Sequence, residues 1–191
     1  MSRIRPLDPP YSSEVQQSFD MIMKGKDPLI LFRTIAVSER AWAKFRAGSL
    51  LDPGPLALRD REIVINRTTA LANCEYEWGV HVAIFAEAAK LTEEQIIATR
   101  NAKSDAPCWS DAERALIAAV DALHHSATLD RAQFDRLRDY YDDAQILEIL
   151  MLCGFYRTVS YVANALDLPL ESKGVRFPGA ASSGAMPMER S

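Results

Sequence analysis

A thiol, a carboxylate and an imidazole recur at helical spacing in the segment Asn73-Cys-Glu-Tyr-Glu-Trp-Gly-Val-His81. Glu77 follows Cys74 by three residues, and His81 follows Glu77 by four. At 3.6 residues per turn, a helix that begins at Cys74 places all three side chains on one face, with Glu77 next to His81. A carboxylate beside an imidazole orients the ring and raises its basicity, which suits general acid–base chemistry near neutral pH.

The thiol of Cys74 is open to several interpretations. In the first turn of a helix, the macrodipole lowers a thiol pKa and favours the thiolate, whereas the charges of Glu75 and Glu77 oppose that shift. A cysteine in a helix is also a common small core residue, and a Glu–His pair four apart is often a surface ion pair. The spacing Cys-x-x-Glu-x-x-x-His is uncommon for zinc and no fourth ligand is apparent, so we expect neither a metal nor a cofactor.

Helices are the elements that must position these groups. Four segments place a capping residue three positions before Glu or Gln, a pattern typical of a helix start; they begin at Thr92, Ser110, Asp130 and Asp142. Asn73 is predicted to be the N-cap of the helix that carries His81. No alternating strand pattern is present. The sequence therefore predicts an all-α fold with helices near 12–24, 29–48, 56–72, 74–89, 93–102, 111–126, 131–139 and 143–166.

Composition indicates one globular domain. The chain has 191 residues, of which 48% are hydrophobic and 25% charged, and this is enough for one core. We assign it to residues 1–170. From Glu171 onward, Gly, Pro, Ser and Ala dominate, and such a segment cannot form its own core. Residues 171–191 are therefore expected to be a tail, either flexible or packed on a neighbouring subunit.

The charge pattern argues against several partners. A net charge of −4 with scattered Lys and Arg provides no basic stripe for nucleic acid and no cluster for an anionic membrane. No leader or membrane-spanning segment is apparent. Three widely separated cysteines are typical of a reducing compartment, so the expected location is the cytoplasm.

The segment also resembles a known family. Arg61-Glu62, the stretch from Asn73 to His81, and the residues from Ala86 through Thr92-Glu-Glu look like the core of the carboxymuconolactone decarboxylase-like family. That family includes the alkylhydroperoxidase D-like proteins. The resemblance extends from about Pro28 to the last predicted helix, and it implies a compact multi-helix bundle of the alkylhydroperoxidase D-like type. It also implies a homo-oligomer, either a trimer or a hexamer.

The resemblance implies roles for individual residues. In the alkylhydroperoxidase D-like branch, a Glu precedes Cys-x-x-Cys-x-x-x-His, and a Glu–His relay activates a dithiol that reduces peroxide. Glu62 matches the relay carboxylate, Cys74 the first cysteine and His81 the histidine. Glu77 stands in place of the second cysteine, and Tyr76 in place of another histidine. The two-thiol cycle needs both sulfurs within disulfide reach, and neither Cys108 nor Cys153 is placed near Cys74 by the sequence. Other branches lack the cysteines, and in them a proton is moved and a carboxylate is lost from a lactone acid.

Three hypotheses follow. The first is an acid–base enzyme that acts on a small organic acid or lactone by decarboxylation, isomerisation or hydrolysis. In it His81 is the general acid/base, Glu62 and Glu77 tune it, and Cys74 lines the pocket, which Tyr76 and Trp78 help to form. The second is a one-cysteine alkylhydroperoxidase, a peroxiredoxin-type antioxidant in which Cys74 is oxidised. The third is a non-enzymatic helical oligomer.

Overall fold

The computed structural model of the chain describes residues 2–179, and every regular element in that range is an α-helix. The helices in chain order are α1 (Ser13–Met23), α2 (Ile30–Ile35), α3 (Glu39–Ala47), α4 (Leu58–Leu71), α5 (Glu75–Phe85), α6 (Glu93–Asn101), α7 (Asp111–Ser126), α8 (Arg131–Arg138) and α9 (Asp143–Ala165). The predicted all-α class is confirmed.

The four predicted capping boxes begin helices α6, α7, α8 and α9. In each, the N-cap oxygen accepts a hydrogen bond from the third backbone N–H, and the Glu or Gln side chain at that third position accepts one from the N-cap N–H; the N-cap residues are Thr92, Ser110, Asp130 and Asp142. These bonds satisfy backbone groups that a helix start otherwise leaves unpaired. Because they join residues three apart, their positions could be predicted from sequence alone.

Two predicted helices have different ends in the structure. The single helix predicted over 29–48 is two helices, because Ser38 caps α3 through a hydrogen bond from the N–H of Ala41 and has an extended backbone. The helix predicted over 74–89 ends at Phe85, and Lys90 in the turn that follows has a left-handed φ of 54°. A side-chain cap inside an apolar pattern was enough to interrupt the first of these helices.

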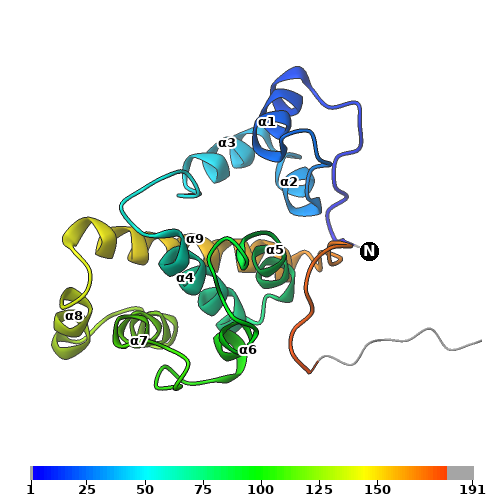
Figure 1. Ribbon diagram of the computed structural model, residues 1–191. Coiled ribbons are helices and arrows are strands. Elements are labelled where there is room, and N and C mark those ends of the chain that lie inside the picture. Colours follow the sequence, from blue (N-terminus) through cyan, green and yellow to red (C-terminus); the bar gives the residue numbers. More distant parts are fainter. Residues whose placement is uncertain (1, 180–191) are drawn as a thin grey trace, which may run out of the picture.

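Helix α4 lies at the centre of the fold. It packs against α5, α6, α7 and α9, and Figure 1 shows these helices arranged around it. Its residues from Glu62 to Ala70 are all buried. A helix that is buried on every side provides positions where a polar side chain can be shielded fully from water.

The longest helix, α9, also belongs to the core. By length and composition it could cross a membrane. Its residues Ile149, Leu152 and Tyr156 are buried, and it packs along α4. The core helix of a folded domain has the same apolar character. Helices α1 to α3 form a smaller cluster beside this core, centred on Phe19 and Trp42.

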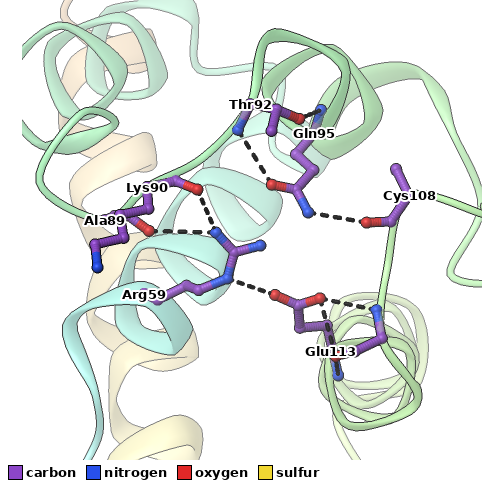
Figure 2. A network of polar contacts seen from close by, with 8 residues as sticks. Arg59, Ala89, Lys90, Thr92, Gln95, Cys108 and Glu113 are labelled. Carbon is purple, nitrogen blue, oxygen red and sulfur yellow. Dashed lines mark hydrogen bonds and ion pairs between the residues drawn. The ribbon is translucent and has the colours of Figure 1, made fainter.

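A network of polar contacts connects the turn after α5 to α4 and α7 (Figure 2). The guanidinium of Arg59 donates to the carbonyls of Ala89 and Lys90 and forms a 2.6 Å ion pair with Glu113. In the same view, Gln95 donates to the carbonyl of Cys108 at 2.8 Å. Because Arg59 lies on α4, this network joins the turn after α5 to both α4 and α7.

Residues 171–179 lie across α5 of the same chain (Figure 1). Tyr76 donates to the carboxylate of Glu171, Glu75 pairs with Arg176 at 2.8 Å, and the N–H of Val175 donates to the carbonyl of Gly79 at 3.1 Å. We call residues 171–179 the C-terminal strap. The rest of the predicted tail, 180–191, lies outside the described residues.

Candidate active site

The structure brings Glu62, Glu77 and His81 together in the interior. Glu62 comes from α4, while Glu77 and His81 lie on one face of α5, as their spacing predicted. The Nδ1 of His81 is 2.8 Å from Oε2 of Glu62, and its Nε2 is 3.5 Å from Oε1 of Glu77. All three side chains are buried, and Glu62 is 0% exposed. The imidazole therefore has a carboxylate at each ring nitrogen.

Arg61 completes the charge balance of this group. Its guanidinium is 3.1 Å from Oε1 of Glu62 and also donates to the carbonyl of Leu51. With His81 protonated, two cations face two carboxylates, which reduces the free-energy cost of burying charge. Both oxygens of Glu62 are thus engaged, whereas Oε2 of Glu77 is buried without a hydrogen-bond partner.

The two carboxylates keep His81 protonated. Burial alone lowers the pKa of the imidazole, but the charge and hydrogen bond of Glu62, followed by those of Glu77, outweigh burial and raise the pKa to about 9. At neutral pH the group therefore holds a proton that it can donate.

We predict that the protein becomes less stable as pH rises from about 6.5 to about 9. The pKa of His81 in the folded protein is about 9, against 6.5 for an ordinary histidine. A raised folded pKa stabilises the fold fully below the ordinary value, and this stabilisation is lost as pH rises through the folded value. Urea denaturation across this range measures the change, and the slope is expected to be smaller in His81→Gln. An equal slope in the variant would show that another group titrates.

Cys74 lies at the start of α5, but its surroundings do not favour the thiolate form that thiol chemistry requires. It is the N-cap residue, and Asn73, which was predicted to be the N-cap, instead has a left-handed φ of 52°. That prediction was wrong because the chain reverses direction between α4 and α5, and asparagine tolerates this conformation. Burial raises the pKa of the Cys74 thiol to about 11 and outweighs the neighbouring polar groups that favour the thiolate, of which the N–H of Glu77 has the largest effect. Burial therefore has the largest effect on the pKa of this thiol.

The two aromatic residues predicted to line the pocket point to other partners. The hydroxyl of Tyr76 accepts from the N–H of Leu31 at 2.9 Å and donates to Glu171 in the C-terminal strap. The indole of Trp78 donates to Thr99 at 3.0 Å and packs against Phe177. Both contacts fix the position of α5, and neither reaches the His81 ring.

Two other aromatic residues contact His81. Tyr156 of α9 meets the ring edge-on at 5.0 Å between centroids, and Phe85 packs on it at 5.1 Å. The guanidinium of Arg61 in turn lies over the Phe85 ring. Phe85 is one helical turn after His81, a spacing visible in the sequence. Tyr156 is distant in sequence, so only the packing of α9 on α4 and α5 reveals its role.

The other two cysteines lie on other elements of the fold. Cys108 lies between α6 and α7, and Cys153 lies on α9; both are free thiols, as is Cys74. Within residues 2–179, no group of three or more His, Cys, Asp or Glu side chains is arranged to hold a metal ion.

Comparisons with known proteins agree with this architecture. The profile of the carboxymuconolactone decarboxylase family matches residues 38–122, which include Glu62, Cys74, Glu77 and His81. No curated protein matches the chain.

Several solved structures share the fold. An uncharacterized peroxidase-related protein from Silicibacter sp. TM1040 has a TM-score of 0.78 at 19% identity, covering 91% of this chain and 93% of its own. A protein of unknown function from Agrobacterium tumefaciens, described as a putative antioxidant defence protein AhpD, has a TM-score of 0.65 at 21% identity, with 71% and 94% covered. The debrominase Bmp8 has a TM-score of 0.71 at 19% identity, with 89% and 92% covered. Residues 38–122 thus match the carboxymuconolactone decarboxylase family, and the chain has the alkylhydroperoxidase D-like fold.

Proposed function

We propose that this protein is an acid–base enzyme that acts on a small organic acid or lactone by decarboxylation, isomerisation or hydrolysis. One observation supports this proposal above the others: a buried imidazole lies between two carboxylates, and one oxygen of the second carboxylate, Oε2 of Glu77, has no hydrogen-bond partner. An unpartnered buried oxygen is costly, and such oxygens mark candidate sites of proton exchange with a substrate.

The geometry supports one route for the proton. His81 in its protonated form carries a hydrogen on Nε2, which faces Oε1 of Glu77. When that proton moves to Oε1 of Glu77, the imidazole becomes neutral; rotation of the carboxyl group then places the O–H where Oε2 lay, and the proton passes to the substrate. In an isomerisation a proton returns from the substrate and regenerates the imidazolium, whereas after a decarboxylation the proton is replaced from water. The 3.5 Å separation is long for a hydrogen bond, as catalytic contacts often are without substrate.

Glu62 and Arg61 have a positioning role in this proposal. Glu62 fixes the ring of His81 through Nδ1, so that Nε2 is directed at Glu77. Arg61 holds the other oxygen of Glu62 and lies over Phe85, whose ring covers His81. A movement of Phe85 and Arg61 would therefore admit a substrate to the buried group.

A one-cysteine peroxidase is the alternative that the fold itself suggests, because one structural relative is described as a putative antioxidant protein. A peroxidatic cysteine reacts as the thiolate. Here Cys74 is 0% exposed, burial raises its pKa to about 11, and both ring nitrogens of His81 face carboxylates. These features favour acid–base chemistry.

The cytoplasmic location and the trimeric or hexameric state remain predictions.

Cys74→Ser separates the two proposals. We expect the serine variant to retain most of the wild-type turnover, because Cys74 takes no part in the proton route. The measurement is a screen of carboxylated lactones, alkyl hydroperoxides and 2,3,4-tribromopyrrole with both proteins; the last is included because it is bound by a variant of debrominase Bmp8, which shares the fold. Loss of turnover in Cys74→Ser, together with rapid alkylation of Cys74 at pH 7, would support the peroxidase instead.

A further inference from the structure

A cavity lies between α4, α7 and α9, apart from the acid–base group. Its volume is about 340 Å³, within the usual range for small-molecule sites. None of Glu62, Glu77 and His81 lines it. Its apolar wall includes Val120, Leu123 and Leu150, and its polar groups come from Thr68, His124, Arg157 and Tyr161.

The polar groups on one side of this cavity are hydrogen-bond donors. The Nε of Arg157 donates to the hydroxyl oxygen of Tyr161 at 2.9 Å, and its Nη1 donates to Nδ1 of His124. Because Nδ1 accepts, a neutral His124 carries its hydrogen on Nε2. The hydroxyl of Tyr161 accepts from Arg157 and keeps its own hydrogen free. Three side chains can therefore donate to one ligand.

The cavity also carries a positive charge. Across residues 2–179, the side-chain contacts of Arg157 are to His124 and Tyr161, both uncharged. Burial and the charges of Arg157 and His125 lower the pKa of His124, which keeps that imidazole neutral. The end of α7 near Ala127 contributes about half a negative charge at most, which does not cancel the guanidinium.

An unpartnered hydroxyl also lines the cavity. Oγ1 of Thr68 is buried without a hydrogen-bond partner, and Thr68 is 4% exposed. The thiol of Cys153 lies beside it, but a thiol is only a weak hydrogen-bonding group. A buried hydroxyl without a partner is costly, and a ligand in the cavity would provide one.

We infer that this cavity binds a small organic carboxylate with an apolar body. The carboxylate would accept from Arg157, Tyr161 and Nε2 of His124, since guanidinium groups match carboxylates in shape and charge. The apolar part would lie against Val120, Leu123 and Leu150. This site is separate from the acid–base group, and its occupancy does not depend on the proposed reaction.

Benzoate is a suitable probe, with benzamide as its neutral counterpart. Calorimetric titration of the full-length protein is expected to show saturable benzoate binding and at least about ten-fold weaker benzamide binding, as for a charge-assisted contact. Arg157→Gln should weaken benzoate binding about ten-fold or more. Arg131→Gln, on the exposed face of α8, should leave it unchanged. Equal binding of the two probes would overturn the inference.

Gly154→Leu tests whether benzoate binds in this cavity, and it removes no packing contact of the fold. Gly154 lines the cavity, and a Cβ added there meets no atom within 4 Å. Leucine also favours a helix more than glycine does, so the variant should fold and lose benzoate binding because its side chain fills the cavity. Glu77→Gln should bind benzoate as the wild type does. If Glu77→Gln loses binding and Gly154→Leu retains it, benzoate occupies the acid–base group and the inference is wrong.

Discussion

Glu77→Gln is expected to lower turnover by about 10²- to 10⁴-fold, the usual contribution of a positioned acid or base. Glutamine keeps the size of the side chain and can still face Nε2 of His81, but it cannot take up and release a proton. In the variant, an amide group would replace the carboxylate that carries the unpartnered Oε2 of Glu77, and an amide cannot act as an acid. The measurement is kcat for whichever substrate the wild type converts, together with a circular dichroism spectrum to verify folding.

Glu75→Gln is the matched control. Glu75 lies on the same helix two residues earlier and pairs with Arg176 in the C-terminal strap, away from His81. It should retain wild-type kcat, whereas His81→Ala should lose activity as Glu77→Gln does. If Glu77→Gln is folded and fully active while His81→Ala is inactive, the proton reaches the substrate from His81 directly and the route through Glu77 is wrong.

Gly79→Ala is expected to lower the free energy of unfolding by about 3 kcal/mol, at the upper end of the usual cost of overpacking. A methyl group on Gly79 would overlap the carbonyl oxygen of Val175 in the C-terminal strap. The overlap involves backbone, which cannot rotate away as a side chain can. Alanine otherwise stabilises a helix relative to glycine, so the clash must overcome that gain.

Gly154→Ala provides the comparison, because it is the same substitution in a helix where the added methyl group meets nothing within 4 Å. It should leave stability unchanged or raise it by up to about 1 kcal/mol. Urea denaturation measures both variants, and limited proteolysis reports whether the strap has left α5. Equal stability of the two variants would show that the strap does not lie closely on Gly79 in solution.

Several features of the fold and of the site could be predicted from the sequence, because they depend on residues that lie close together along the chain. The hydrogen bonds of a capping box join residues three apart, and all four predicted boxes begin helices. The shared face of Glu77 and His81 follows from helical geometry in the same way. Local patterns of this kind predicted the all-α class and the pairing of Glu77 with His81, whereas Glu62 was assigned through the family resemblance.

The sequence by itself thus determined where α6 to α9 begin and which face of α5 carries the acid and the imidazole. Only the tertiary structure decided the state of each group. The packing of α4 on α5 joins Glu62 to His81 and keeps the imidazole charged, and burial raises the pKa of Cys74, a shift that opposing local charges had left undetermined. Tertiary contacts also decided that Tyr76 binds Glu171 of the strap and that Trp78 binds Thr99 of α6. Desolvation and long-range contacts depend on which segments meet in space, and the spacing of residues along a chain does not contain that information.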